Sequence, residues 1–317
     1  MQFQQLAYFV AVAETRHFTR AAELSRVAQP SLSKQIRALE EDLGAPLFIR
    51  ARGNITLTPA GEALLPLARR ILADVETARR EVQELTGMRR GRVRLGATPS
   101  LCAGLLADAL ALFHERYPGI ELHVEEGGSR DLIRALGRGE LDLALIILPL
   151  HSSDPEFVTV PILRESLVVV SPRSRPSPTP RASMRITDLR DHSLVMFRSG
   201  YDVREATLSA CRAAGFEPRL TVEGGEMDAV LRFVEAGLGL AVVPSMVLRN
   251  RPGLRGTPLA KPRLLRTIAL AHRKDVAPSR TARAFRRVLM SYLGTLTRAD
   301  LGEDLEVIAP PEELEPR

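Results

Sequence analysis

The chain has 317 residues, enough for two or three domains, and its 45% hydrophobic and 26% charged residues are ordinary for a globular protein. The net charge of +6 favours contact with a polyanion, and most of the basic residues are arginines, which bind phosphate and guanine bidentately. The sequence contains neither a signal-peptide pattern nor about 20 consecutive apolar residues, so we expect a cytoplasmic protein without membrane contact.

Three short helices are predicted within the first 45 residues. Apolar residues recur at helical spacing over residues 3–13, and Thr19 can cap a second helix. Ser31 can cap a third helix, which runs to Leu43 and ends at Gly44. Short helices joined by tight turns are typical of a helix-turn-helix unit.

The third predicted helix is amphipathic, with a low polar ridge on its outer face. Its apolar stripe contains Leu32, Ile36, Leu39 and Leu43, and its outer face contains Lys34, Arg37, Ala38 and Glu41. A helix that enters the major groove needs such a face, but an ordinary helix with a solvated face also has it. This helix alone leaves both interpretations open.

Two short strands follow, at residues 46–50 and 55–58, and residues 51–54 have the composition of a hairpin turn. We expect this hairpin to form a wing whose arginines, Arg50 and Arg52, lie against DNA phosphates.

A long helix is predicted from Thr58 onward, with Pro59 at its first position. Apolar residues recur along it at alternating spacings of four and three, which indicates a coiled-coil dimer seam. The alternative is a helix that packs on its own core. The stripe consists of Leu64, Ala68, Ile71, Val75, Ala78, Val82 and Leu85. Residues 87–91 break the helix and are expected to form a hinge.

Residues 92–296 alternate between strand and helix, which predicts parallel sheets. Two such sets suggest two α/β lobes around a cleft. The strand at residues 166–170 lies between the two sets, and the strand at residues 267–271 lies after the second. Both are expected to cross between the lobes. The predicted strands are residues 93–97, 120–124, 141–146, 194–197, 219–223 and 240–243, and the predicted helices are residues 101–117, 130–136, 203–214 and 227–236.

The first 61 residues resemble the LysR-type transcriptional regulators in the identity of several segments and in the order in which these occur. The segments that carry the resemblance are residues 18–24, 28–40, 43–44, 47–50 and 57–61, together with residues 139–144 and 237–244 further along. The resemblance implies an α/β protein with an N-terminal winged helix-turn-helix, a long coiled-coil linker helix and a two-lobed effector region like a periplasmic binding protein. Such a protein is a sequence-specific transcription regulator, not an enzyme, and its promoter binding is modulated by a small molecule.

The expected domains follow from this resemblance. They are residues 1–58 (DNA binding), 59–91 (linker and dimerisation helix with hinge), 92–296 (effector binding) and 297–317 (an acidic tail without order). We expect lobe I to contain residues 92–163 and 267–296, and lobe II residues 164–266.

The resemblance also implies a homodimer or homotetramer on a partly palindromic double-stranded DNA site, with RNA polymerase as a further partner. It places six residues at or near the DNA: Gln29, Pro30, Ser31, Ser33, Lys34 and Arg37. Many members have Arg at position 34, and Lys34 lacks the bidentate fork for guanine. Arg20, Arg50 and Arg52 would hold phosphates, which strengthens binding without reading the sequence.

Ligands of open α/β sheets bind beyond the carboxyl ends of the strands. There the sequence places the hydroxyls of Thr98, Ser100 and Ser129 at helix starts, where an anion is favoured. Arg198, with Ser199 and Tyr201 beside it, adds a positive charge from the facing lobe. We therefore predict a small carboxylate-like effector and no cofactor. The alternative is that the three hydroxyls only cap helices.

Other functions fit less well. An enzyme would need a nucleophile or an acid–base pair, and the six histidines have no metal spacing. A solute-binding protein would not need residues 1–60. A redox-sensing regulator would need Cys102 and Cys211 to approach each other, although they fall in different predicted lobes.

Overall fold

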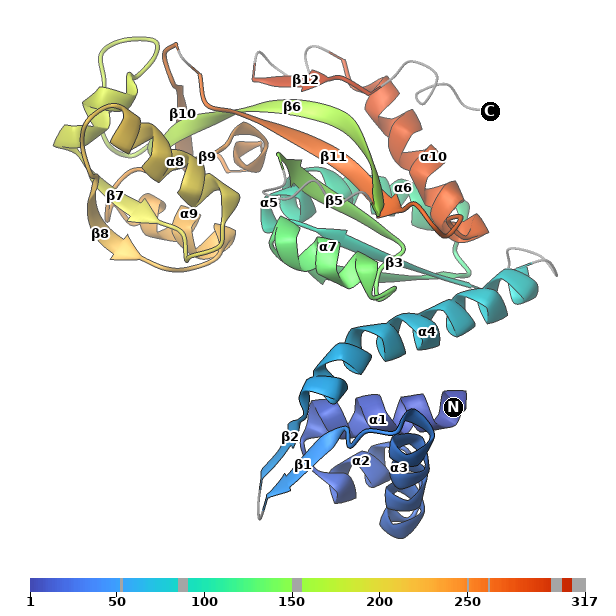
Figure 1. Cartoon of the computed structure of the whole chain (residues 1–317). Coiled ribbons are helices and arrows are strands. Elements are labelled where there is room, and N and C mark those ends of the chain that lie inside the picture. Colours follow the sequence, from blue (N-terminus) through green and yellow to red (C-terminus); the bar gives the residue numbers. More distant parts are fainter. Residues whose placement is uncertain are drawn as a thin grey trace. The chain divides into compact units, whose positions relative to one another are not determined.

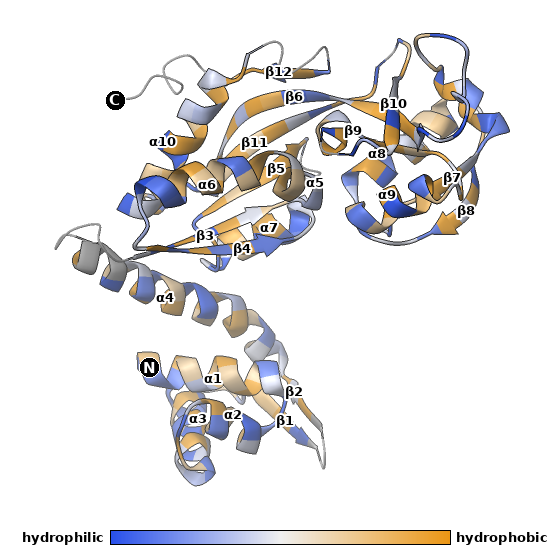
Figure 2. Cartoon of the chain, turned by 180° about the vertical axis from the view of Figure 1, so that it is seen from behind, coloured by the Kyte–Doolittle hydropathy of each residue, from blue (hydrophilic) through white to orange (hydrophobic). Residues whose placement is uncertain are grey.

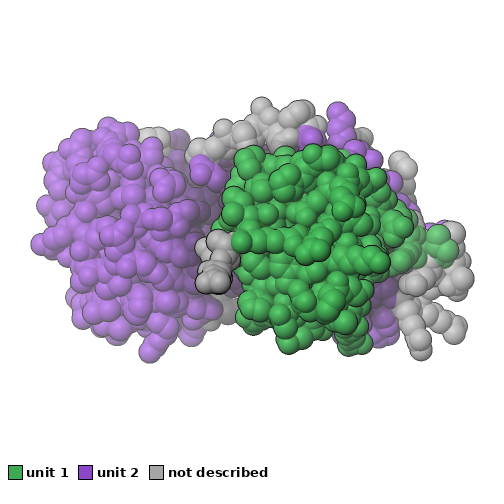
Figure 3. Space-filling view, turned by 60° about the horizontal axis from the view of Figure 1, so that its bottom comes forward, with its two compact units in different colours: residues 1–86, 137–140 green, residues 87–136, 141–317 purple. Residues whose placement is uncertain are grey.

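The computed structural model describes residues 1–51, 54–84, 91–149, 156–249, 251–261, 263–297 and 304–309. The chain divides into two compact units, which are coloured in Figure 3. Unit 1 contains residues 1–86 and 137–140, and unit 2 contains the rest. Within the described residues, no helix combines the length and the apolar character needed to cross a bilayer.

Unit 1 is a three-helix cluster with a two-stranded hairpin and a long helix (Figure 1). Its core is built from the apolar stripes of the helices, and Phe48 of the hairpin packs on Phe9 and Phe18 with ring centroids 5.3 and 5.9 Å apart. The elements are α1 (Phe3–Thr15), α2 (Phe18–Leu24), α3 (Gln29–Leu43), β1 (Phe48–Ala51), β2 (Asn54–Leu57) and α4 (Pro59–Glu84). This is the predicted winged helix-turn-helix followed by a long helix.

The start of α4 is fixed against the hairpin. The hydroxyl of Thr58 donates to the Pro46 carbonyl at 2.6 Å and accepts from the Gly61 backbone N–H at 3.1 Å. Gly61 passes so close to the hairpin that a Cβ atom there would lie 2.3 Å from the Leu47 carbonyl oxygen. Glycine is therefore required at position 61 for the helix to leave the wing at this angle.

Lobe I of unit 2 is a sheet with helices on both faces. Strand β3 lies parallel to β4 and β5, and β11 lies antiparallel to β5. Its elements are β3 (Gly91–Ala97), α5 (Pro99–Leu101), the π-helical turn η1 (Cys102–Leu106), α6 (Ala107–Arg116), β4 (Ile120–Glu126), α7 (Ser129–Gly137), β5 (Leu143–Leu148), β11 (Leu265–Arg273) and α10 (Arg280–Thr295).

Alternating residues of β5 serve two separate cores. Leu145 and Ile147 belong to the core that includes α6 and α10, whereas Ala144 and Ile146 pack with α7 on the opposite face. Strands buried on both faces need apolar residues at every position, which β5 and β11 show as mostly hydrophobic ribbons in Figure 2.

Lobe II is joined to lobe I by the long strand β6 (Phe157–Pro172). Its first part pairs with β11, and its last six residues pair with β9 and β10. The other elements of lobe II are η2 (Ile186–Asp191), β7 (Ser193–Met196), α8 (Asp202–Ala213), β8 (Arg219–Glu223), α9 (Met227–Glu235), β9 (Ala241–Pro244), η3 (Ser245–Leu248) and β10 (Leu254–Pro258).

The predicted βαβαβ unit of lobe I and the parallel pair β7–β8 are confirmed. Strand β6 crosses between the lobes as expected. Strand β11 runs beside it from Leu265, where the lobes meet, into lobe I, and pairs there with β5 and residues 157–166 of β6. The sheets are mixed because β6, β9, β10 and β11 all join antiparallel neighbours.

The prediction that residues 297–317 form a tail without order is wrong for part of it. Leu305–Val307 forms β12, which pairs antiparallel with residues 163–165 of β6. The side chain of Leu305 is buried, and Glu306 forms an ion pair with Arg164 at 3.1 Å. Alternating apolar and acidic residues thus suit a strand at a basic sheet edge. Residues 298–303 and 310–317 lie outside the described residues.

Candidate nucleic-acid interface and ligand site

The outer face of α3 carries most of the residues predicted to approach DNA. Gln29, Pro30, Ser31, Lys34 and Arg37 are exposed, whereas Leu32, Ile36 and Leu39 on the opposite face are fully buried. Ser33 is half-buried and accepts a hydrogen bond from the Gln29 side-chain amide at 2.8 Å. The helix is therefore held by its apolar stripe and presents a polar, basic face to solvent.

The helix begins three residues earlier than predicted. Ala28 occupies the N-cap position and Pro30 lies within the first turn, where its missing N–H costs nothing. The expectation that Ser31 caps the helix is wrong, and Ser31 instead stands on the exposed first turn. In the same way His17, not Thr19, caps α2, since its Nδ1 accepts from the Arg20 N–H at 3.4 Å.

The wing is tied to α3 through Glu40. Its Oε1 atom accepts hydrogen bonds from the backbone N–H groups of Leu47 and Phe48 at 2.9 and 3.4 Å. Its Oε2 atom pairs with the Arg50 guanidinium at 3.0 Å. Arg50 also lies over the Phe18 ring, 5.1 Å from its centroid. Arg50 thus braces the wing, in addition to any phosphate contact, and Arg52 lies outside the described residues.

The apolar stripe of α4 divides into two parts. Ala68 is fully buried, and Leu64 and Ile71 pack against the core of unit 1, so the early part of the stripe serves its own domain. Further along, Val75 is half-buried, Ala78 is exposed, and the Val82 side chain is 65% exposed. The early part of the stripe thus packs on its own domain, as the alternative expected, whereas the dimer seam stays a prediction for the later part. Leu85 lies outside the described residues.

A buried ion pair lies where the two lobes of unit 2 meet. Arg266 of β11 faces Glu165 of β6 directly across the strand pair, and their side chains are 5% and 0% exposed. The Nε atom of Arg266 donates to Glu165 Oε2 at 2.8 Å, and its Nη1 atom donates to the Ser100 hydroxyl at 2.9 Å. Its Nη2 atom is also buried and lies 2.7 Å from Glu165 Oε2, within the same ion pair.

The Arg266–Glu165 pair has polar groups from both lobes around it. From lobe I, Thr98 Oγ1 lies 3.4 Å from Ser100 Oγ. From lobe II, the Met246 backbone N–H donates to Glu165 at 2.7 Å, and the carboxylate of Asp202 lies 3.6 Å from Arg266 Nη1. Thr98 and Ser100 are both buried. The arrangement couples the position of α8 in lobe II to the start of α5 in lobe I.

The other predicted ligand residues lie on neighbouring loops. Ser129 accepts a hydrogen bond from the Ile147 backbone N–H at 3.0 Å, so it fastens α7 to the end of β5. The loop before α7 touches the loop before α8, because a Cβ atom on Gly128 would lie 3.5 Å from the Gly200 carbonyl oxygen. The two lobes therefore meet beside three of the predicted ligand positions, Ser129, Ser199 and Tyr201.

On the lobe II side of this contact, Tyr201 is 5% exposed and stacks on Phe197, with ring centroids 5.2 Å apart. Its buried hydroxyl has no hydrogen-bond partner in the described part of the chain. Arg198 covers the Tyr201 ring and pairs with Glu226 at 2.6 Å, and Ser199 is exposed.

Sequence reasoning overlooked Arg266, Glu165 and Asp202. A signal was present, since Glu165 and Arg266 are charges inside apolar strands, where a charged residue needs a partner. Nothing local identified each as the partner of the other across 101 residues.

Neither cysteine has the character of a reactive thiol. Burial, with a smaller contribution from Glu126, raises the pKa of Cys102 to about 12. Burial, assisted by Glu217, raises the pKa of Cys211 to about 11. Cys102 lies in η1 of lobe I and Cys211 on α8 of lobe II.

Comparison with known proteins identifies both parts of the chain. Residues 3–62 match the model for bacterial regulatory helix-turn-helix proteins of the lysR family, and residues 86–294 match the LysR substrate binding domain. The matched models and the relatives below are transcriptional regulators, not enzymes.

Among curated proteins, the transcriptional dual regulator GltC of Bacillus subtilis is 32% identical over 285 residues, covering 88% of this chain and 94% of that protein. The DNA-binding transcriptional dual regulator OxyR of Escherichia coli is 30% identical, covering 86% of this chain and 90% of its own.

Among solved structures, full-length OxyR from Pseudomonas aeruginosa has a TM-score of 0.69 and 30% identity, covering 94% of this chain and 96% of its own. The full-length structure of CbnR complexed with its target DNA has a TM-score of 0.67 and 27% identity, covering 91% of this chain and 99% of its own.

Proposed function

The chain belongs to the LysR family of DNA-binding transcriptional regulators with effector-binding domains, and from this premise we propose how its own residues read DNA and sense a ligand. Regulators of this family bind DNA and small-molecule effectors and form oligomers. We place this one in the cytoplasm, acting on promoter DNA together with RNA polymerase.

The observation that carries the DNA proposal is the two-sided character of α3. Its buried stripe fixes the helix on the domain, and its exposed face offers Gln29, Lys34 and Arg37 to the edges of bases. Arg20 is exposed on α2 and suited to a phosphate. In this arrangement α3 lies in a major groove and α2 crosses the backbone beside it.

Fluorescence anisotropy on a duplex from upstream of the protein's own gene, and on its scrambled version, tests this arrangement. Arg37→Ala should cost about 1–3 kcal/mol on the specific duplex and much less on the scrambled one. Arg20→Ala should weaken both equally and lower the slope of log affinity against log salt by about 1. Arg79→Ala on α4 is the control. Equal losses on both duplexes for Arg37→Ala would contradict the placement of α3.

We propose that the later part of the α4 stripe joins two copies into a dimer, so that two α3 helices read the two halves of a partly palindromic site. The exposed Val82 side chain supports this role, since an apolar residue left exposed on a long amphipathic helix is suited to a dimer contact. Val82→Glu should lower the molecular mass measured by light scattering at low micromolar concentration. Glu76→Ala, about 120° around the helix, should not change it.

We propose a small carboxylate as the effector, bound where the two lobes meet beside Ser100 and Tyr201. The Tyr201 hydroxyl, which is buried without a hydrogen-bond partner among the described residues, supports this position. Two guanidinium groups lie beside this position, Arg266 in its pair with Glu165 and Arg198 in its pair with Glu226.

A thermal-melting screen of small carboxylates and their matched amides tests the effector site. The carboxylates that bind should raise the melting temperature more than their amides do. Tyr201→Phe should leave the unliganded melting temperature unchanged or slightly higher, since it removes an unpartnered hydroxyl, and should reduce the ligand-induced shift. An unchanged shift would move the effector away from Tyr201.

A further inference from the structure

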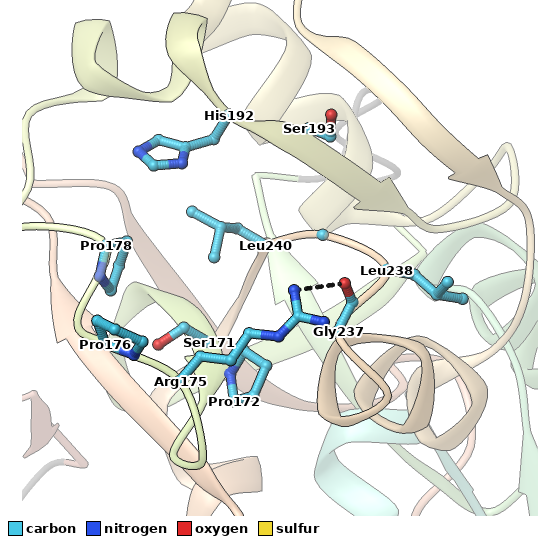
Figure 4. Close-up of a pocket in the computed structure, with 11 residues that line it drawn as sticks. Ser171, Pro172, Arg175, Pro176, Pro178, His192, Ser193, Gly237, Leu238 and Leu240 are labelled. Carbon is cyan, nitrogen blue, oxygen red and sulfur yellow. Dashed lines mark hydrogen bonds between the residues drawn. The ribbon is translucent and has the colours of Figure 1, made fainter.

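A pocket of about 420 Å³ lies in lobe II, away from the meeting point of the lobes (Figure 4). Its walls come from the end of β6 and the loop after it, from the start of β7, and from the turn before β9. The volume lies within the range of about 300–1,000 Å³ that is usual for small-molecule sites. Ser171, at the pocket, is six residues from Glu165, the buried carboxylate where the lobes meet, along an extended strand, or about 20 Å.

The pocket has a mainly apolar lining. Leu238 and Leu240 contribute side chains from the turn before β9, and Pro172, Pro176 and Pro178 contribute rings from the loop after β6. Figure 4 shows Pro176 and Pro178 on one side of the group and Leu238 on the other. Because proline fixes its own φ angle, this wall loses little conformational entropy when a ligand binds.

A guanidinium is fixed at the pocket by the backbone. Arg175 Nη1 donates to the Gly237 carbonyl at 3.0 Å, and Gly237 has a φ of +82°. A Cβ atom on Gly237 would lie 2.2 Å from Arg175 Nη2, so only glycine allows the guanidinium to lie there. The Arg175 carbonyl also accepts from Arg255 Nη1 at 3.2 Å, which anchors the backbone below the side chain.

Arg175 is the one charged side chain among the eleven described residues that line the pocket. His192 lies across from Arg175, and none of the eleven lining residues, all within the described part of the chain, is acidic. Ser171 also lines the pocket, and its hydroxyl is buried without a hydrogen-bond partner among the described residues. An unpartnered buried hydroxyl costs free energy unless a ligand or a water satisfies it.

We propose that this pocket is a second ligand site, separate from the effector site between the lobes, and that it binds a carboxylate with an apolar ring system. The ring system packs against the prolines and Leu240, the carboxylate pairs with the Arg175 guanidinium, and the Ser171 hydroxyl donates a hydrogen bond to the ligand. Since the walls include the end of β6 and the turn before β9, which pairs with it, an occupied site stiffens the lobe II part of the strand that joins the lobes.

The probe is 2-naphthoate, whose binding to the full-length protein can be followed by its own fluorescence anisotropy, since the chain has no tryptophan. We expect saturable binding to the wild type and at least tenfold weaker binding of the uncharged 2-naphthylmethanol. Arg175→Met, an exposed substitution that keeps the length of the side chain, should weaken naphthoate binding at least tenfold. Ser171→Ala should weaken it severalfold without lowering the melting temperature.

The matched control is Arg173→Met, two residues away, which is also exposed and also bound to a backbone carbonyl but lies outside the pocket. It should bind naphthoate within twofold of the wild type, as should Tyr201→Phe at the effector site. Unchanged binding by Arg175→Met, equal binding of the alcohol, or loss of binding in Tyr201→Phe would each overturn the second site. The last result would place naphthoate between the lobes and leave the proposed function intact.

Discussion

Glu40 of α3 and Arg50 of the wing form an ion pair of 3.0 Å, and the same carboxylate accepts the backbone N–H of the first wing residues. We expect Glu40→Ala to destabilise unit 1 by about 1–3 kcal/mol, because it leaves two backbone donors and one guanidinium without their acceptor. Urea unfolding monitored by circular dichroism measures this. Glu41→Ala, at the exposed neighbouring position, should stay within about 0.5 kcal/mol of the wild type. Equal effects of the two changes would contradict the bracing role.

Removing the buried Glu165 carboxylate should lower the free energy of unfolding. Glu165→Gln keeps the shape of the side chain but leaves the buried Arg266 charge with only the more distant Asp202 carboxylate at 3.6 Å, so we expect a loss of about 3–5 kcal/mol in the free energy of unfolding. Glu306→Gln breaks the exposed pair with Arg164 one residue away and should cost less than about 1 kcal/mol. The double variant Glu165→Gln/Arg266→Met should recover much of the loss. If it is as unstable as Glu165→Gln alone, the buried charge is not the cause.

The stability of unit 2 should depend on Glu126. Burial, and then the nearby charges of Glu226 and Asp228, raise the pKa of Glu126. A carboxyl whose folded pKa exceeds its unfolded value takes up its proton first in the folded state, so the protein loses stability as the pH rises through the folded pKa. Arg198 and Arg251 pair with Glu226 and Asp228 and limit the size of the effect.

We therefore expect Glu126→Gln to melt at a higher temperature than the wild type at pH 7, and the difference to disappear as the pH falls below about 4.3, the ordinary value for glutamate. Melting curves over this pH range measure it. A difference that stays constant with pH would show that titration of Glu126 is not involved.

Hydrogen peroxide should not regulate this protein through its cysteines, although several relatives are named as hydrogen peroxide-inducible genes activators. With pKa values of about 12 and 11, each thiol is ionised in about one molecule in 10⁴ or fewer at pH 7, and the thiolate is the reactive form. DNA affinity should be the same before and after peroxide treatment, in the wild type and in Cys102→Ser/Cys211→Ser alike. A peroxide response that the double variant lacks would refute this expectation.

The elements that could be predicted from sequence are those with a local pattern. The stripe of Leu32, Ile36 and Leu39 specifies α3 and its orientation, and the apolar run from Leu143 predicts β5. The stripe on α4 was equally regular, yet periodicity does not say what an apolar face contacts. Ala68 packs on its own domain, whereas Val82 remains exposed.

The elements that were missed depend on distant residues. Only residues 166–170 of β6 were predicted because Pro161, Arg164 and Glu165 interrupt its apolar pattern. Pro161 lies at a register shift of the strand, and Glu165 is neutralised by Arg266 from β11. The helix α10 did have local signals, a Ser279 cap and the buried Phe285 and Leu289, that the sequence reading did not use.

The distance in sequence between partners also explains which ligand-site residues could be predicted from the sequence. Thr98 and Ser100 follow a strand directly and were identified by that position. Their partner Arg266 comes from 166 residues further along, so only the folded chain reveals it.

The pairing of β12 with β6 has a consequence for how the protein is made. Leu305 lies opposite Glu165, so the backbone of β6 at Glu165 gains its β12 strand partner only from residues near position 305. The joint between the lobes at β6 therefore cannot reach its final form on the ribosome until residues up to Val307 have been translated and have emerged. Fusions or truncations near that position would act on the joint between the lobes and not on a dispensable end.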